Sequence, residues 1–412
     1  MPPPRTRART RAGASALRDR DRSLLLALTS LPTASGCEWA VQGALDAWIA
    51  ARGTRLSSRR DDAGNLLIRR ATGAAPRLLI TAHLDHPAFV VRRVLPKRGI
   101  ELEFRGGVHD PYFRGAAIEV FDGRGTPHRA RIASLDAEAK PFKIVRAVLR
   151  GDAPAIPLGA IGRWALPEAE IRAGMLHTHA CDDLAAVAAA LIAYERLLER
   201  GAADGVGLLF TVAEEVGFLG AIRAASSGLI PRGAALLCLE NSRSFPHDSP
   251  IGAGAILRVG DRLSVFSPGL TNALTQLYQR HAAAAPAFRW QRKLMAGGAC
   301  EATAFAALGH ESTCLCLPLG NYHNMVDIDG VLAGRRRARI GREFISIDDF
   351  EGLVSMLVLA ADAFGAPSVR KGARGAARQA SARAPLGDFA PLMRTLWRER
   401  SAKVLGRRGR AG

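Results

Sequence analysis

Two adjacent glutamates, Glu214 and Glu215, directly follow the apolar run 206–210, which has the composition of a buried β-strand. Neighbouring carboxylates repel each other, and carboxylates are almost never buried without a partner. A solvated strand end is the simple explanation for the pair. A bound cation is the alternative, and other segments of the chain bear on the choice.

Four further segments carry acidic residues or histidine where an apolar run ends or a helix begins. They supply His83 and Asp85 after "RLLITA", Asp182 and Asp183 after "MLHTHAC", Glu240 after "AALLCL", and His323 after "TCLCLPLGNY". Each has an ordinary explanation by itself: Asp183 could cap the next helix, and His323 could be a core histidine. Because ligands bind beyond the carboxyl ends of strands in open α/β sheets, we expect the five segments to meet at one edge.

This mixture of imidazole and carboxylate side chains suits a pair of divalent metal ions. Two ions a few Å apart need a bridging carboxylate, further imidazole and carboxylate ligands, and an open position for water. Zinc fits this donor set, and cobalt or manganese could substitute. A second carboxylate beside a ligand could take a proton from water, which would explain why two glutamates stand side by side.

The segments that must position these residues alternate between strand and helix patterns. Continuous apolar strands such as "GVGLLFTVA" and "ESTCLCLPL" are typical of a parallel sheet covered on both faces, and "LAAVAAALIAYERLLERG" predicts a long helix ending at glycine. We therefore predict an α/β fold: a three-layer α/β/α sandwich with a mostly parallel sheet, formed by residues 23–87 and 173–365. Short β-branched runs separated by turns predict a small inserted all-β domain, resembling a barrel, at residues 88–172.

The net charge of +19 is concentrated at the two ends of the chain. Residues 1–22 form a predicted disordered basic tail, and residues 366–412 form a second basic tail, in which 389–405 predicts a short amphipathic helix. Nucleic acid could bind through these tails, although solubilising disordered sequence is the simpler interpretation. No apolar stretch is long enough to span a membrane, no signal-peptide core is present, and the six cysteines are scattered, so we expect a cytoplasmic protein with free thiols.

Taken together, these motifs resemble the dinuclear-zinc aminopeptidases of the glutamyl aminopeptidase and tetrahedral-aminopeptidase type, which are related to the leucyl-aminopeptidase-like zinc peptidases. The resemblance covers roughly residues 23–365. It rests on "LTSLPTASGCE", "DDAGNLLIRR", "AHLDH", "CDDLAA", "VAEEVGFLGA", "LEN" and "LPLGNYHN". It implies a zinc-peptidase-like sandwich, two divalent ions that are most simply zinc, and a peptide substrate. It also implies a homo-oligomer assembled through the inserted β domain.

The resemblance also implies a role for each candidate residue. His83 would bind one ion, and Asp85 would orient its imidazole. Asp182 would bridge both ions, Asp183 would support that geometry, and Glu240 would complete the site of His83.

At the second ion, Glu215 and His323 would be the ligands, and Glu214 would be the general base. The segment "MAGGACEAT" is expected to form a substrate loop, in which Gly298 would lie and Glu301 would hold the substrate's amine. An ordinary glycine turn is the alternative for this segment.

The implied function is a metal-dependent aminopeptidase that cleaves peptide bonds with water activated by two metal ions. Several residues depart from the family pattern: His86 replaces an acidic residue, Glu240 is typical of carboxypeptidase-like relatives, and Asn324 follows the last histidine. These departures leave two alternatives open. One is a carboxypeptidase, deacylase or cyclase on the same scaffold, and the other is a non-catalytic metal- or nucleic-acid-binding protein that acts through its arginine-rich tails.

Overall fold

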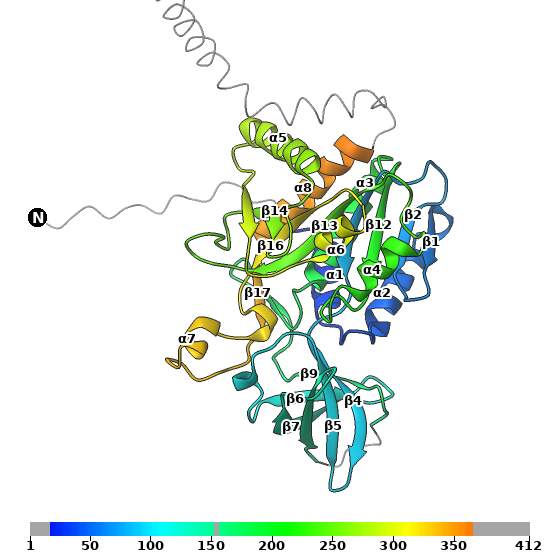
Figure 1. Cartoon of the computed structure of the whole chain (residues 1–412). Helices are drawn as coiled ribbons and strands as arrows, with labels where there is room; N and C mark the ends of the chain where they lie inside the picture. The colour runs from blue at the N-terminus through cyan, green and yellow to red at the C-terminus, as the bar shows by residue number, and fades with distance from the viewer. Residues whose placement is uncertain (1–16, 152–155, 366–412) are drawn as a thin grey trace, which may run out of the picture.

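The computed structural model describes residues 17–151 and 156–365, which form a large α/β unit and a smaller β-barrel below it in Figure 1. The second basic tail, with its predicted helix at 389–405, lies outside the described residues, as do residues 1–16 of the first tail. No helix in the described part of the chain has both the length and the apolar composition needed to cross a membrane.

The α/β unit is built on an eight-stranded mixed sheet. Its strands, in spatial order, are β1 (Leu56–Arg60), β2 (Leu66–Arg70), β12 (Val206–Thr211), β3 (Leu78–His83), β13 (Ala235–Arg243), β16 (Ser312–Leu319), β14 (Ala255–Asp261) and β15 (Trp290–Met295). The central strands β12, β3, β13 and β16 pair in parallel, as do β14 and β15, whereas the other three pairings are antiparallel. The predicted α/β class is therefore confirmed, but the sheet is more mixed than the sequence suggested.

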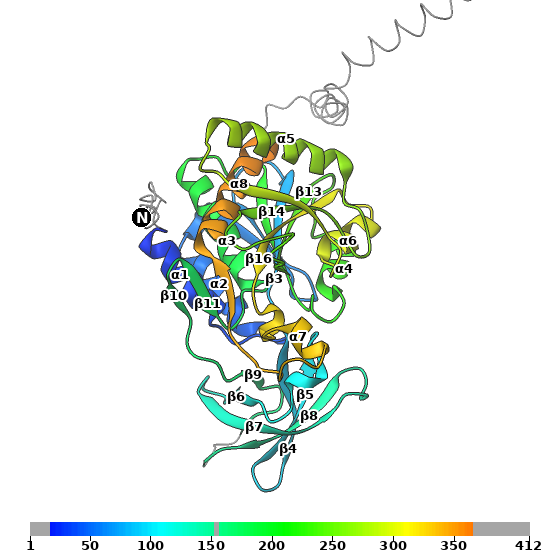
Figure 2. The ribbon, with the colours of Figure 1, turned by 90° about the vertical axis from the view of Figure 1, so that its left-hand side faces the viewer.

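Helices cover both faces of this sheet, as Figures 1 and 2 show. One face packs against α1 (Asp19–Thr29), α2 (Trp39–Ala50), α3 (Leu184–Glu199), α5 (Pro268–Ala284) and α8 (Ile347–Gly365), and the other against α4 (Leu219–Ser226) and α6 (Glu301–Ala307). Strand residues alternate between the two cores: Leu208 and Phe210 join the first, and Leu209 joins the second. Every residue of β3, β12 and β16 is buried, which explains their continuous apolar sequences.

Helix α3 lies against the sheet centre and carries the segment that follows the aspartate pair. Its alanine-rich sequence is buried at almost every position up to Tyr194, so the helix can approach both the sheet and α8 closely. The helix ends before Gly201, whose φ of +67° fits the glycine stop predicted from the sequence.

A closed six-stranded barrel lies between β3 and α3 along the chain. Its strands, in order around the barrel, are β4 (Ala88–Leu95), β5 (Gly99–Arg105), β8 (Lys143–Leu149), β7 (Pro127–Asp136), β6 (Ala117–Phe121) and β9 (Ile161–Trp164). Phe89, Phe104, Phe113 and Trp164 fill its interior, with ring centroids 4.8 to 6.2 Å apart. Such aromatic packing gives this small unit its own core.

A three-stranded sheet joins the barrel region to the α/β unit. It consists of β10 (Glu170–Arg172), β11 (Met175–Thr178) and β17 (Glu343–Ser346), and α7 (Ile328–Leu332) lies nearby in sequence. The remaining elements are short 3-10 helices at Gly53–Arg55, Asp110–Tyr112 and Tyr322–Asn324.

Two predicted boundaries need correction. Helix α1 begins at Asp19, inside the segment assigned to the first tail, because Asp21 is buried and pairs with Arg196 of α3 at 3.2 Å. Strand β10 was assigned to the inserted domain, but it pairs with β11 and lies outside the closed barrel. Both errors arise because partners distant in the sequence decide where these segments pack.

Candidate metal centre

The parallel centre of the sheet brings the predicted residues to one edge. Strand β3 ends at His83, Glu214 follows β12, Glu240 lies within β13, and His323 follows β16. Since these four strands are neighbours and run in parallel, their carboxyl ends point the same way. The turn before α3 brings Asp182 to the same edge.

Asp182 lies at the centre of the cluster. Its Oδ1 is 3.3 Å from Nε2 of His83, and its Oδ2 is 3.5 Å from Nε2 of His323. The same nitrogen of His323 is 3.3 Å from Oε1 of Glu215. Ligand-type atoms lie within 4.8 Å of one another in three groups: His83, Asp182, Asp183 and Glu240; His83, Glu214 and Glu215; and Asp182, Glu215 and His323.

Several of these atoms are buried without a hydrogen bond, which is unusual for polar groups in a folded protein. Among the described residues they include both ring nitrogens of His83, Oδ1 of Asp182 and Oε1 of Glu215. Imidazole nitrogens and carboxylate oxygens at such distances are the donor set of a zinc-type ion. The residues present therefore fit the metal site predicted from the sequence.

The electrostatics of the cluster also favour a bound cation. Burial raises the pKa of Glu214 and of Glu240 well above the usual range, and neighbouring carboxylates add to the effect. Burial alone would lower the pKa of His83 and of His323, but the surrounding carboxylates raise both well above normal. Both shifts show an excess of negative charge in a buried space, which divalent cations would neutralise.

Asp85 connects two other chain segments to His83. Its Oδ1 accepts the backbone N–H of Glu214 at 3.0 Å and lies 3.3 Å from Nδ1 of His83. Its Oδ2 accepts the hydroxyl of Ser35 at 2.6 Å and the N–H of Glu215 at 3.0 Å. The carboxylate therefore holds the turn of the glutamate pair beside the imidazole.

Asp183 does not cap α3 with its side chain. Its Oδ2 accepts the N–H of His83 at 3.3 Å, and its Oδ1 accepts the side-chain amide of Asn241 at 2.9 Å. The same amide nitrogen also donates to the carbonyl of Cys181 at 2.7 Å. Asp183 and Asn241 together connect β3, β13 and the turn before α3.

Glu343 is a site residue that the sequence analysis missed. This fully buried carboxylate accepts the backbone N–H groups of Cys181, Asp182 and His323 at 2.7, 3.1 and 2.8 Å. It thereby joins the two segments that carry the central aspartate and the last histidine. A carboxylate that receives main-chain donors has no local sequence signature, so its role could not be predicted.

The barrel contributes to the orientation of His323. The imidazole donates from Nδ1 to the carbonyl of Gly107 at 2.6 Å, which leaves Nε2 facing Asp182. His86, one of the departures from the family pattern, contacts the carbonyl of Asp182 at 2.5 Å and Oδ1 of Asn324 at 3.1 Å. His86 therefore has a structural role beside the cluster.

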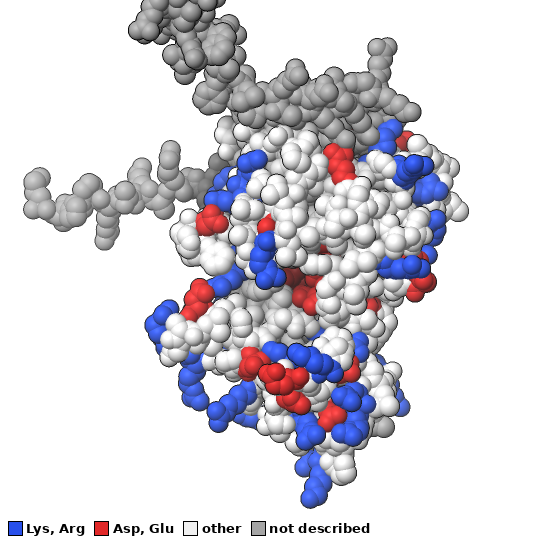
Figure 3. Space-filling view, viewed as in Figure 1, with Lys and Arg blue, Asp and Glu red and all other residues white. Residues whose placement is uncertain are grey.

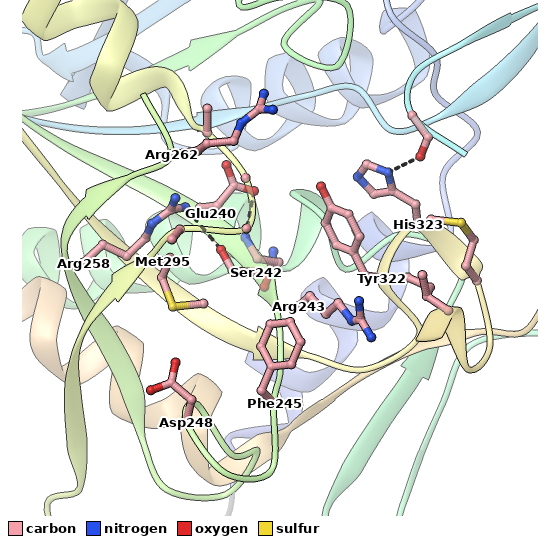
Figure 4. Close-up of a pocket in the computed structure, with 18 of the residues that line it drawn as sticks. Glu240, Ser242, Arg243, Phe245, Asp248, Arg258, Arg262, Met295, Tyr322 and His323 are labelled. Carbon is pink, nitrogen blue, oxygen red and sulfur yellow. Dashed lines mark hydrogen bonds between the residues drawn. The ribbon is translucent and has the colours of Figure 1, made fainter. Parts of the chain in front are cut away.

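A cavity of about 640 Å³ opens beside the cluster, and its lining includes Glu240, His323 and Gly298. Acidic atoms are visible in the hollow at the centre of the face shown in Figure 3, and Figure 4 shows the cavity side chains. Glu301 does not line this cavity. It is buried at the start of α6, where it accepts the hydroxyl of Thr81 at 3.2 Å.

Arg258 also lines the cavity, although its residue is only 1 % exposed. Its Nη1 donates to the hydroxyl of Ser242 at 3.2 Å, and its Nε has no hydrogen bond. Within residues 17–151 and 156–365, no carboxylate forms an ion pair with it. Burial lowers the pKa of this guanidinium, whereas neighbouring thiol groups and the carboxylate of Glu240 raise it above its usual range. A cation at the cavity wall is suited to binding an anion that enters the cavity.

Comparison with known proteins agrees with this geometry. Residues 152–335 match the family described as M42 glutamyl aminopeptidase. The chain is related to the M42 glutamyl aminopeptidases. The predicted relationship to dinuclear-zinc aminopeptidases is thus confirmed, and it supports a metal-dependent hydrolase of the aminopeptidase type. No curated protein gives a significant match.

Solved structures of peptidases share the fold. A TET aminopeptidase from the marine sediment archaeon Thaumarchaeota archaeon SCGC AB-539-E09 superposes with a TM-score of 0.68 at 17 % identity, over 87 % of this chain and all of that one. The TET1 peptidase of Pyrococcus horikoshii gives 0.66 at 19 % identity, over 83 % and 99 % of the chains. An aminopeptidase from Desulfurococcus kamchatkensis gives 0.66 at 17 % identity, over 86 % and 99 %.

Proposed function

We propose that this M42 relative is an aminopeptidase that uses two divalent metal ions, most simply zinc, to hydrolyse the first peptide bond of its substrate. The observation that carries the proposal is the convergence of three ligand groups at one sheet edge, two of them sharing Asp182. Their orphaned buried atoms need cations, and the cavity beside them can admit a peptide end. The helix–sheet–helix layers and the barrel would then be the sandwich and inserted domain of a zinc peptidase.

The residues would divide between the two ions as the family resemblance implies. His83, Asp182 and Glu240 would hold one ion, and Asp182, Glu215 and His323 would hold the other. When bound, such ions polarise a carbonyl group and make water a stronger nucleophile at neutral pH. Asp85, Asp183, Gly107 and Glu343 orient the ligands through the hydrogen bonds described above.

Glu214 is the proposed general base. It is 7 % exposed and is adjacent to the ligand Glu215, and burial raises its pKa above that of an ordinary glutamate. A carboxylate with a raised pKa can take a proton from water and return it to the leaving nitrogen. The sequence analysis suggested that Glu301 holds the substrate's amine. This role stays a proposal, and the buried position of Glu301 does not support it.

The direct test is hydrolysis of amino-acyl p-nitroanilides before and after treatment with a chelator, followed by addition of zinc, cobalt or manganese. We expect activity to disappear with the chelator and to return with metal. Glu214→Gln should lose most activity while binding metal normally, whereas the exposed Glu138→Gln should behave as wild type. Wild-type rates in Glu214→Gln would refute the assigned base.

N-blocked peptides separate this function from its relatives on the same scaffold. An aminopeptidase must reject a blocked amino terminus, whereas a carboxypeptidase or deacylase would accept it. Glu240 motivates this comparison, since glutamate at this position is typical of the carboxypeptidase-like relatives. Cleavage of blocked peptides at rates equal to those for free peptides would favour the alternative.

The cavity also suggests which first residue is preferred. Arg258 offers its buried guanidinium to a carboxylate, so we propose a preference for glutamyl or aspartyl peptides, in agreement with the family description. Glutamyl p-nitroanilide should be cleaved faster than leucyl p-nitroanilide, and Arg258→Met should reduce this ratio at least tenfold. An unchanged ratio would remove Arg258 from the specificity proposal.

A homo-oligomer is the proposed assembly. The TET1 peptidase of Pyrococcus horikoshii assembles into a tetrahedron or an octahedral shell, and three exposed apolar residues of this chain, Val94, Val148 and Leu158, lie in the barrel region. Light scattering of the purified protein would test this assembly. A monomer at micromolar concentration would contradict it. The cytoplasmic location and nucleic-acid binding by the tails stay predictions.

A further inference from the structure

Tyr322 places a phenol hydroxyl beside the candidate metal centre. Its ring stacks on the imidazole of His323, with centroids 3.8 Å apart and planes inclined by 23°. Together with Glu240 and His323, the tyrosine lines the cavity. The stacking fixes the ring and therefore restricts where its hydroxyl can point.

The hydroxyl of Tyr322 differs from those of the other tyrosines. The chain has four, and three of their hydroxyls donate to main-chain carbonyls: Tyr112 to Val326, Tyr194 to Val206 and Tyr278 to Met356. The hydroxyl of Tyr322 forms no hydrogen bond with any residue that the structure describes. In Figure 4 it points into the cavity and lies between the carboxylate of Glu240 and the imidazole of His323.

Tyrosine phenols are protonated at neutral pH, since their usual pKa is about 10. At neutral pH the group is therefore a neutral O–H donor. Tyr322 is partly buried and lines the cavity, so a molecule bound there can accept a hydrogen bond from its O–H group.

We propose that Tyr322 is a catalytic residue whose O–H donates a hydrogen bond to the oxygen of the scissile carbonyl. This inference rests on the proposed function. As a water oxygen bonds to the carbonyl carbon, the π electrons of the carbonyl group move onto the carbonyl oxygen. Glu214 takes a proton from the water. When the C–N bond breaks, the electrons return to the carbonyl, and Glu214 gives its proton to the leaving nitrogen. Tyr322 keeps its own proton throughout.

A donor of this kind accelerates the reaction because the oxygen becomes more negative in the transition state than in the bound substrate. The ground-state carbonyl gains much less from the bond, so the effect should appear in kcat rather than in KM. Removing one such donor from an acyl-transfer site typically lowers kcat by about 10²- to 10³-fold. Because Tyr322 is one of several groups that act here, we expect a loss of about 10²-fold.

Tyr322→Phe is the suitable variant, since it keeps the ring stacked on His323 and removes only the oxygen. Tyr112→Phe is the matched control, because the hydroxyl of Tyr112 bonds to the carbonyl of Val326 and Tyr112 does not line the cavity. Four quantities are measured for both variants: kcat and KM on an amino-acyl p-nitroanilide, metal content, and the affinities of two inhibitors. The inhibitors are an aminophosphonic acid that mimics the tetrahedral transition state and the corresponding free amino acid.

For Tyr322→Phe we expect kcat to fall about 10²-fold, with KM within threefold of wild type and metal content unchanged. The aminophosphonic acid should bind more weakly by a similar factor, whereas affinity for the free amino acid should stay the same. Tyr112→Phe should keep all four quantities near wild type.

The outcomes distinguish this inference from the function on which it rests. An active wild type with unchanged kcat in Tyr322→Phe overturns the role of Tyr322 alone. An equal loss of affinity for both inhibitors, or a loss of metal, also overturns it and indicates a structural role. A wild type without chelator-sensitive peptidase activity overturns both proposals.

Discussion

Asp85→Asn tests how much of the candidate metal centre depends on one carboxylate that is not itself a proposed ligand. The two oxygens of Asp85 accept three donors: the hydroxyl of Ser35 and the backbone N–H groups of Glu214 and Glu215. Asparagine has a single acceptor oxygen, and its NH2 group would face a main-chain donor in either orientation. The hydroxyl of Ser35 can turn to accept from the NH2 group, but a backbone N–H cannot.

At least one buried N–H is therefore left unpaired in Asp85→Asn. Such a group costs about 1–3 kcal/mol, so the free energy of unfolding should fall by that amount. The turn that carries the glutamate pair would also shift relative to His83. Replacing groups that orient metal ligands typically lowers metal affinity by about 10- to 100-fold, and we expect a loss in this range.

The assay is urea unfolding of chelator-treated protein, together with zinc affinity from competition with a fluorescent chelator. Ser35→Ala is the matched control, since it removes one donor and leaves both oxygens for the backbone. It should cost only about 0.5–1.5 kcal/mol and change metal affinity little. The reasoning is wrong if Asp85→Asn keeps its metal affinity within twofold and its unfolding free energy within about 0.5 kcal/mol, a typical surface-substitution effect.

Other predictions concern the barrel and the ligand set. Gly106→Ala should destabilise the protein by about 2 kcal/mol or more and weaken zinc binding, because φ is +128° and a Cβ would lie 2.7 Å from Pro87 beside the carbonyl that orients His323. Gly123→Ala, with open space around it, should change neither quantity in thermal unfolding and chelator competition. In the β6–β7 turn, the hydrogen bond from His128 and then backbone N–H groups lower the pKa of Asp122 to about 2. Because this pKa lies below the unfolded value, the stabilising contribution is present above about pH 4 and is lost as the pH falls toward 2. The Tm difference between wild type and Asp122→Asn should therefore shrink from pH 7 to pH 3, and a constant difference would contradict the assignment.

The sequence determined which residues are chemically unusual and the broad fold class. Apolar runs that end in His83, Glu214 or Glu240 predicted strands of a sheet covered on both faces, and the rule on carboxyl ends predicted their convergence. These inferences succeed because the burial of a strand and the direction of the chain can be recognised from the local sequence. The structure brings all five proposed ligands together at one edge.

Only the tertiary structure decided how these residues are held. The carboxylate of Glu343 accepts three backbone N–H groups from segments about 20 and 160 positions away, and any buried segment could supply such donors. The positions of the Tyr322 hydroxyl and the Arg258 guanidinium at the cavity wall, and the pairing of β10 outside the barrel, depend in the same way on distant neighbours. Residue type states what a side chain can do, whereas long-range packing decides which partners it has and which of its polar groups are left for a ligand.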